Sequence, residues 1–94
     1  MKVVWSRRAI QHLVALRKYI EKDSEQNAAF VAKRILQSIE ILQTQPDMGR
    51  PGRVLGTREL VIPDTRYIVP YRVRGDWVEI LRAFHTSRRL PRRW

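Results

Sequence analysis

The chain has 94 residues, a length typical of one domain, and we expect residues 1–94 to form a single domain. Because 44% of the residues are hydrophobic and 30% are charged, the chain is too apolar for a disordered tail and too polar for a membrane protein. It has no cysteine and two histidines, which excludes disulfides and thiol catalysis, and we expect no metal ion or other cofactor. The net charge of +10 indicates an acidic partner: nucleic acid, an anionic membrane surface or an acidic protein.

The first half of the sequence predicts a short strand followed by two helices. Residues 2–5 are β-prone, and Ser6 is a natural N-cap for a helix over residues 6–22. Capping residues at 23–27 interrupt the helical spacing, and a second helix follows and ends before Pro46. So short a break predicts an antiparallel helical hairpin. The apolar positions that define the two buried helix faces are Ala9, Ile10, Leu13, Leu16 and Ile20, and then Ala28, Val31, Ala32, Ile35, Ile39 and Leu42.

The second half predicts strands. Residues 45–56 are rich in proline and glycine and are expected to form a loop. Alternating apolar residues then predict a short strand at 60–62, a second strand at 67–73 and a long last strand at 77–84. Pro70 has no amide hydrogen, so its strand needs a bulge or an unpaired position there. Three aromatic residues have the strand parity expected of core positions: Tyr67, Tyr71 and Trp77.

The order β-α-α-β-β-β predicts an α+β fold. A helical hairpin would pack on one face of a small, mainly antiparallel sheet and leave the other face largely uncovered. No apolar run approaches the roughly 18 residues that cross a bilayer, and Ser6, Arg7 and Arg8 stand where a signal peptide would be apolar. We therefore expect a cytoplasmic protein with no membrane partner.

The basic charge is concentrated in the second half of the chain. Residues 50–94 contain 11 arginines and four acidic residues, whereas residues 1–49 contain eight basic and five acidic residues. Arginine makes bidentate contacts with phosphate and stacks on bases, so this distribution favours nucleic-acid binding by the sheet and the tail. A solvated basic surface is the simpler alternative. The candidate nucleic-acid-binding residues are Arg58, Arg66, Arg72, Arg89, Arg92 and Arg93.

His85, at the end of the last predicted strand, is the candidate for chemistry. Histidine both donates and accepts a proton near neutral pH, and neighbouring arginines can stabilise charge that develops on a phosphate. Metal-free RNA cleavage needs these two functions, because the 2'-hydroxyl of the substrate serves as the nucleophile. We therefore group His85 with Arg82 and Arg88 as candidate catalytic residues. The alternative is a structural histidine at a strand end, and His12, among polar neighbours, is expected on the surface of the first helix.

Several segments together resemble the RelE/ParE family of bacterial toxins. They are the opening strand with SRRA at 6–9, QPDMGRPG at 45–52, GTREL at 56–60, YIVPYR at 67–72 and VEILRAFH at 78–85. The resemblance covers nearly the whole chain. It implies the toxic half of a type II toxin-antitoxin module, with a helical hairpin on an antiparallel sheet, inhibited by a cognate antitoxin that lies over the hairpin or the arginine face.

The resemblance leaves the molecular target open between two branches of the family. RelE-like members cut messenger RNA on the ribosome without a metal ion, and ParE-like members poison DNA gyrase. His85 occurs at a position where both branches carry histidine, and Ile68 stands where RelE-like members usually have arginine. The high charge and the arginine-rich tail lead us to expect the mRNA endonuclease, with the gyrase inhibitor as the alternative and a non-catalytic RNA-binding module as a third hypothesis.

Overall fold

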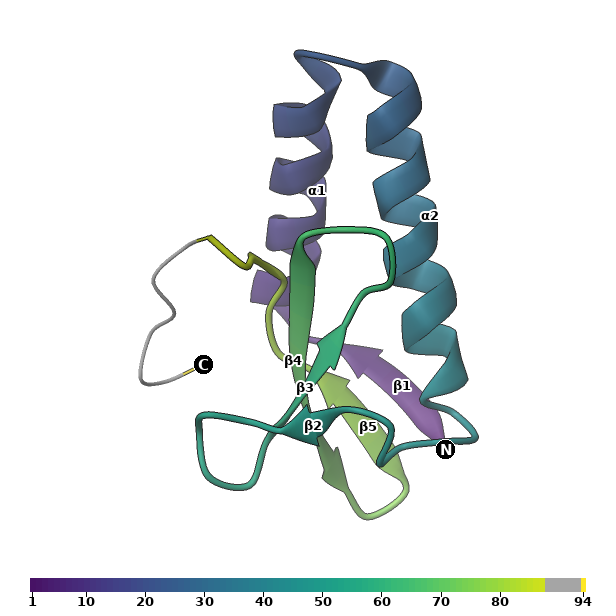
Figure 1. The fold of residues 1–94 in the computed structure, drawn as a ribbon. Helices are drawn as coiled ribbons and strands as arrows, with labels where there is room; N and C mark the ends of the chain where they lie inside the picture. The colour runs from purple at the N-terminus through teal and green to yellow at the C-terminus, as the bar shows by residue number, and fades with distance from the viewer. Residues whose placement is uncertain (88–93) are drawn as a thin grey trace.

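The computed structural model describes residues 1–87 and 94, and its two helices form the predicted hairpin (Figure 1). Helix α1 spans Arg7–Glu21 and helix α2 spans Glu25–Ile41. The Ser6 hydroxyl caps α1 by accepting a hydrogen bond from the Ala9 amide at 3.0 Å, and Ser24 caps α2 in the same way. The predicted cap of the first helix is thus confirmed. No helix in the described part of the chain is long and apolar enough to cross a membrane.

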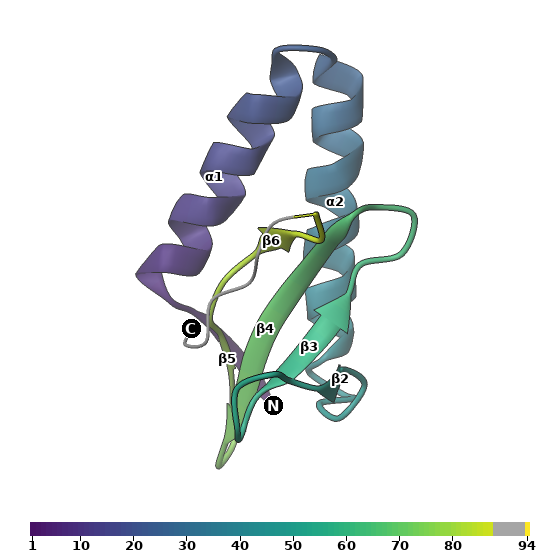
Figure 2. The same cartoon turned by 60° about the vertical axis from the view of Figure 1, so that its left-hand side comes forward.

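Within residues 1–87 and 94, six strands form one sheet, with the order β1-β5-β4-β3-β2 and with β6 paired to β4. Among the described strands, β1 and β5 run parallel and the other four pairs are antiparallel, so the predicted α+β fold with a mainly antiparallel sheet is confirmed. The long strand β4 lies in the middle of the sheet (Figure 2). The strands are β1 (Lys2–Trp5), β2 (Arg50–Pro51), β3 (Arg58–Val61), β4 (Tyr67–Arg74), β5 (Trp77–Ile80) and β6 (Phe84–His85).

The prediction of one long last strand is wrong, because this segment forms two separate strands, β5 and β6. Tyr71 pairs with Ile80 in the first part of the ladder, but Ile68 pairs with Phe84 in the second, so the broken strand carries one extra residue. The Leu81 amide donates to the Pro70 carbonyl at 2.9 Å at this break. The break lies beside Pro70, as the missing amide hydrogen predicted. The expected loop also contains the two-residue strand β2, which pairs with β3.

The core lies between the hairpin and one face of the sheet. Ile10, expected in the helix face of the core, is instead half exposed. Tyr67 and Tyr71 are buried as predicted. The core cluster contains Ala9, Leu16, Val31, Ile35, Ile39 and Leu42 from the helices and Leu60, Ile62, Tyr67, Val69, Tyr71, Val78, Ile80 and Ala83 from the sheet region.

The opposite face of the sheet is partly covered, which corrects the expectation of a largely open face. Ile68 and Pro70 have the parity of this face and are almost completely buried. The Trp94 indole donates a hydrogen bond to the Thr57 hydroxyl at 3.1 Å and lies 5.5 Å from the Phe84 ring. Trp77 was wrongly expected in the core: it pairs with Arg74 on this second face and is 49% exposed.

Candidate functional site

His85 lies on β6, where pairing with Tyr67 fixes its position beside the first residue of β4. Its Nδ1 atom accepts a hydrogen bond from the Ser87 amide at 3.1 Å and lies 2.7 Å from the Ser87 hydroxyl. The imidazole ring meets the Tyr67 ring edge-on at 5.2 Å between centroids. Because Nδ1 accepts from a backbone amide, a neutral His85 carries its proton on Nε2.

His85 lines a cavity of about 490 Å³ that lies between α1 and the start of β4. His12 lines the same cavity, and its Nδ1 atom accepts a hydrogen bond from the Ala83 amide at 3.3 Å. The expectation of a surface His12 is therefore wrong, because packing on the Ala83–Phe84 segment buries part of the ring. The side chains of Tyr19, Tyr67 and Ser87 complete the polar lining, and no arginine or lysine of the described residues lines the cavity.

Arg82, grouped with His85 from the sequence, donates through Nη1 to the Leu81 carbonyl oxygen at 2.8 Å. Burial, followed by the nearby positive charge of Arg8, lowers the pKa of Arg82 from its ordinary value. Arg82 is not among the residues that line the His85 cavity. The structure therefore does not bring these two predicted catalytic residues together around one cavity.

Two of the described arginines expected to bind nucleic acid, Arg58 and Arg72, make side-chain contacts within the protein. Arg58 donates through Nη1 to the Gly49 carbonyl at 2.7 Å and so fixes the loop before β2. Arg72 forms an ion pair with Glu79 at 3.1 Å across the β4–β5 ladder. Arg66 is exposed in the turn before β4, and its carbonyl accepts from the Thr86 amide. Arg58 pairs with Tyr71 and so lies on the opposite face of the sheet from Arg72, while Arg66 lies in the turn at the other end of β4.

The predicted tail residues fall outside the part of the chain that the structure describes. They are Arg88, Arg89, Arg92 and Arg93. Their assignment to catalysis or nucleic-acid binding stays a prediction.

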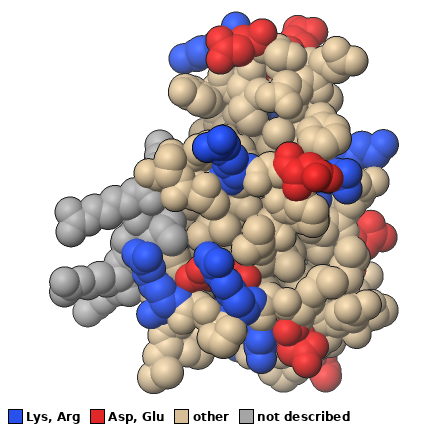
Figure 3. Space-filling view, in the orientation of Figure 1, with Lys and Arg blue, Asp and Glu red and all other residues tan. Residues whose placement is uncertain are grey.

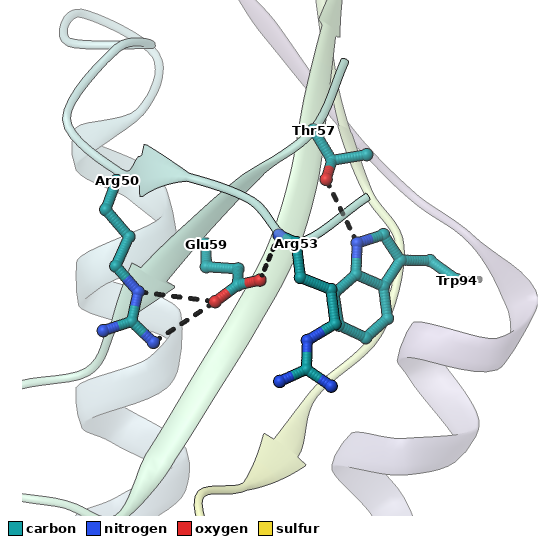
Figure 4. Close-up of polar contacts among 5 residues, drawn as sticks. All are labelled: Arg50, Arg53, Thr57, Glu59 and Trp94. Carbon is teal, nitrogen blue, oxygen red and sulfur yellow. Dashed lines mark hydrogen bonds and ion pairs between the residues drawn. The ribbon is translucent and has the colours of Figure 1, made fainter. Parts of the chain in front are cut away.

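Glu59 organises a group of contacts that sequence reasoning missed. Its side chain is 5% exposed, and it accepts hydrogen bonds from the Arg50 guanidinium at 3.2 Å and from the Arg53 amide at 2.8 Å (Figure 4). A buried carboxylate needs such partners because desolvation is costly. The signal available in the sequence was this acidic residue, because the other residues of β3 are basic or apolar. Figure 3 shows basic side chains gathered in the lower half of the molecule, with acidic side chains among them.

Comparisons with known proteins define the class. The family model described as "ParE toxin of type II toxin-antitoxin system, parDE" matches residues 3–90. The solved structure of the chromosomal ParDE TA system from P. aeruginosa matches with a TM-score of 0.82 at 28% identity, over 93% of this chain and 97% of that chain. The fold and these matches identify a toxin of a type II toxin-antitoxin system, which implies a cognate antitoxin as partner.

Two relatives agree with this class. The chain is 43% identical over 90 residues to the Y4kP protein of Sinorhizobium fredii, covering 96% of this chain and 93% of the relative. It is 32% identical over 87 residues to Toxin RelE2 of Caulobacter vibrioides, covering 93% of this chain and 97% of the relative. The chain belongs to the ParE toxin family, within the RelE/ParE group that its sequence resembles.

Proposed function

We propose that this toxin acts as a ParE-like inhibitor of DNA gyrase and binds its target without cutting RNA. The observation that carries the proposal is the engagement of Arg58 and Arg72 in contacts within the protein. Such contacts hold the arginines as structural groups of the sheet. The family match and the ParDE structure support the same branch.

The arrangement of His85 and Arg82 differs from what RNA cleavage requires. Without a metal ion, cleavage needs a proton-transfer group and a cation that meet the same phosphate within hydrogen-bond distance. In the described residues, His85 faces a cavity lined by tyrosines and a second histidine, while Arg82 is hydrogen-bonded to a backbone carbonyl. Inhibition of a protein target does not require a proton-transfer group and a cation to meet at one site. A gyrase inhibitor also acts where the bacterial chromosome lies, so we propose a cytoplasmic location.

The second candidate function is the ribosome-dependent mRNA endonuclease, with the ribosome and mRNA as partners. The observation in its favour is the cavity shared by His12 and His85, since two imidazoles are able to provide an acid and a base. The basic tail at 88–93 would supply the phosphate contacts in this hypothesis.

Induction of the toxin without its antitoxin tests the proposal. Incorporation of labelled thymidine and labelled methionine is followed in the same culture, with full-length transcripts monitored by RNA blotting. The gyrase proposal predicts that DNA synthesis stops first, with an SOS response and intact transcripts. Early loss of methionine incorporation together with cut messages would support the endonuclease instead. A strain that co-expresses the antitoxin is the control.

A further inference from the structure

Two alanines leave room for the His85 cavity between α1 and the sheet. Ala15 lines the cavity from α1, and Ala83, which precedes β6, lines it from the sheet region. Figure 2 shows β6 on the side of β4 that faces α1. The cavity volume of about 490 Å³ falls within the range of roughly 300–1,000 Å³ that is typical of small-molecule sites. The space is therefore sufficient for a compound of two fused rings.

The cavity has an apolar floor and a polar rim. Leu16 and Tyr67 are buried lining residues and form the floor, whereas Tyr19 and Ser87 are exposed and place hydroxyl groups at the rim. Small-molecule sites commonly combine an apolar wall with a few polar groups that fix the orientation of the ligand. A ligand would therefore place an apolar body on the floor and a polar group at the rim.

His85 supplies a hydrogen-bond donor to this rim. Its Nδ1 atom accepts from the Ser87 amide at 3.1 Å and lies 2.7 Å from the Ser87 hydroxyl, so a neutral ring carries its proton on Nε2. Within residues 1–87 and 94, the structure shows no hydrogen-bond partner for Nε2. In this arrangement the imidazole offers an N–H group to an acceptor while it carries no charge.

The remaining lining favours an uncharged aromatic ligand. Among the described residues, the lining contains no lysine, arginine, aspartate or glutamate, so a charged ligand would lose its hydration without gaining a counter-ion. The ring of Tyr67 meets the imidazole of His85 edge-on at 5.2 Å between centroids. Aromatic rings of this kind pack favourably against a further planar ring.

We propose that this cavity binds a small, uncharged, planar aromatic molecule whose carbonyl oxygen accepts a hydrogen bond from Nε2 of His85. The ring of the ligand packs on Leu16 and Tyr67, and the carbonyl group lies at the rim. This site is separate from the contact with gyrase, because it concerns binding of a small molecule to the free toxin.

The test follows the amide resonances of isotope-labelled toxin while three compounds with the same naphthalene ring are added separately. Naphthalene carboxamide carries a neutral carbonyl group, naphthalene carboxylate carries a charge, and methylnaphthalene has no acceptor. Physiological ionic strength is used to screen the net charge of +10. We expect the carboxamide to shift the amides of Ala15, Ala83 and His85 saturably and to bind roughly 5- to 10-fold more tightly than either other compound. No saturable shift with the carboxamide, or tighter binding of the carboxylate, would overturn the proposal.

Two tryptophan variants locate the site. Ala15→Trp fills the cavity from α1, whereas Ala29→Trp makes the same change on the exposed side of α2, outside the cavity lining. Loss of carboxamide binding is expected for Ala15→Trp alone. Equal affinities in the two variants would overturn the proposal.

The His85→Leu variant tests the donor. Leucine keeps an apolar side chain at this position but removes the N–H group, so the carboxamide is expected to lose its advantage over methylnaphthalene. A retained advantage in the folded variant would overturn the proposal. The three compounds on the wild-type toxin decide the question if this variant does not fold.

Nucleobases share the chemistry of the proposed ligand and reach a protein either as small molecules or within RNA. Uridine and a uridine-rich RNA are therefore compared as competitors of the carboxamide. Displacement at similar uridine concentrations supports a small-molecule site, whereas displacement by the RNA at a much lower concentration would assign the cavity to nucleic acid and overturn the proposal. Gyrase takes no part in these measurements, so failure of this proposal and failure of the proposed function are distinguishable.

Discussion

The hydroxyl group of Tyr71 accepts a hydrogen bond from the Gly49 amide at 2.8 Å and thereby joins the middle strand of the sheet to the loop that leads into β2. The same hydroxyl donates to the Pro46 carbonyl at 2.7 Å. A Cβ atom at Gly49 would lie 2.6 Å from the Tyr71 ring, so only glycine fits this contact. The start of the loop is thus positioned by a buried side chain more than 20 residues away.

Removal of this hydroxyl is expected to destabilise the protein. The Tyr71→Phe variant leaves the buried Gly49 amide without its acceptor, which costs about 1–3 kcal/mol of unfolding free energy. Urea unfolding followed by circular dichroism measures the change. Tyr19→Phe is the control, because Tyr19 is 68% exposed on α1. Equal losses in the two variants would contradict the role given to the Tyr71 hydroxyl.

The stability of the protein is expected to fall at alkaline pH through Tyr71. Burial raises the pKa of the Tyr71 hydroxyl above its ordinary value of 10.0, so the folded state holds this proton more tightly than the unfolded state. The resulting stabilisation is complete below about pH 10 and is lost as pH rises through the folded-state pKa. Urea unfolding between pH 8 and pH 12 is predicted to show a steeper decline for the wild type than for Tyr71→Phe. Parallel declines would show that other groups cause the effect.

Neutralisation of Glu59 is expected to loosen the loop between β2 and β3. In Glu59→Gln, the buried partner of Arg50 and of the Arg53 amide loses its charge, and we expect a loss of roughly 1–3 kcal/mol with faster amide exchange at 50–57. The matched control is Glu21→Gln, which breaks an exposed ion pair with Arg17 and should cost less than about 1 kcal/mol. A stability loss no larger than that of the control would remove Glu59 as the organiser of this loop.

Substitution of His85 distinguishes the two candidate functions. Glutamine can accept the hydrogen bond from the Ser87 amide but cannot transfer a proton near neutral pH. The gyrase proposal predicts that His85→Gln inhibits growth as strongly as the wild type at equal expression level. A loss of inhibition of about 100-fold or more in a folded variant would support the endonuclease, for which His85 is the proton-transfer residue.

The sequence was sufficient for the elements whose signals are local. Ser6 caps α1 and Pro70 marks the break in the ladder, because each depends on the backbone chemistry of its own segment. Trp77 was misplaced because its face is decided by pairing with Arg74 and Lys2, which come from other strands. The strand β2 was missed because two residues form a strand only when β3 lies beside them.

The candidate site was harder to predict because the availability of a charge depends on its neighbours in space. Arg72 and Arg58 have the residue type and strand position of phosphate-binding groups. However, Arg72 forms an ion pair with Glu79 on the neighbouring strand, and Arg58 donates a hydrogen bond to the Gly49 carbonyl. His12 comes to the His85 cavity only because α1 packs against Ala83. These contacts join residues that are far apart in the sequence or on different strands, so residue spacing alone does not predict them.

The central claim is tested most directly with purified components. Gyrase holoenzyme, ATP and relaxed plasmid are incubated with the toxin, with the toxin–antitoxin complex or with buffer, and supercoiling and cleaved plasmid are measured on agarose gels. The account predicts that the free toxin blocks supercoiling and accumulates cleaved DNA, that the complex does neither, and that the same toxin preparation leaves mRNA intact in a translating extract. Unimpaired supercoiling at a large excess of free toxin, with mRNA cut in the extract, would contradict it.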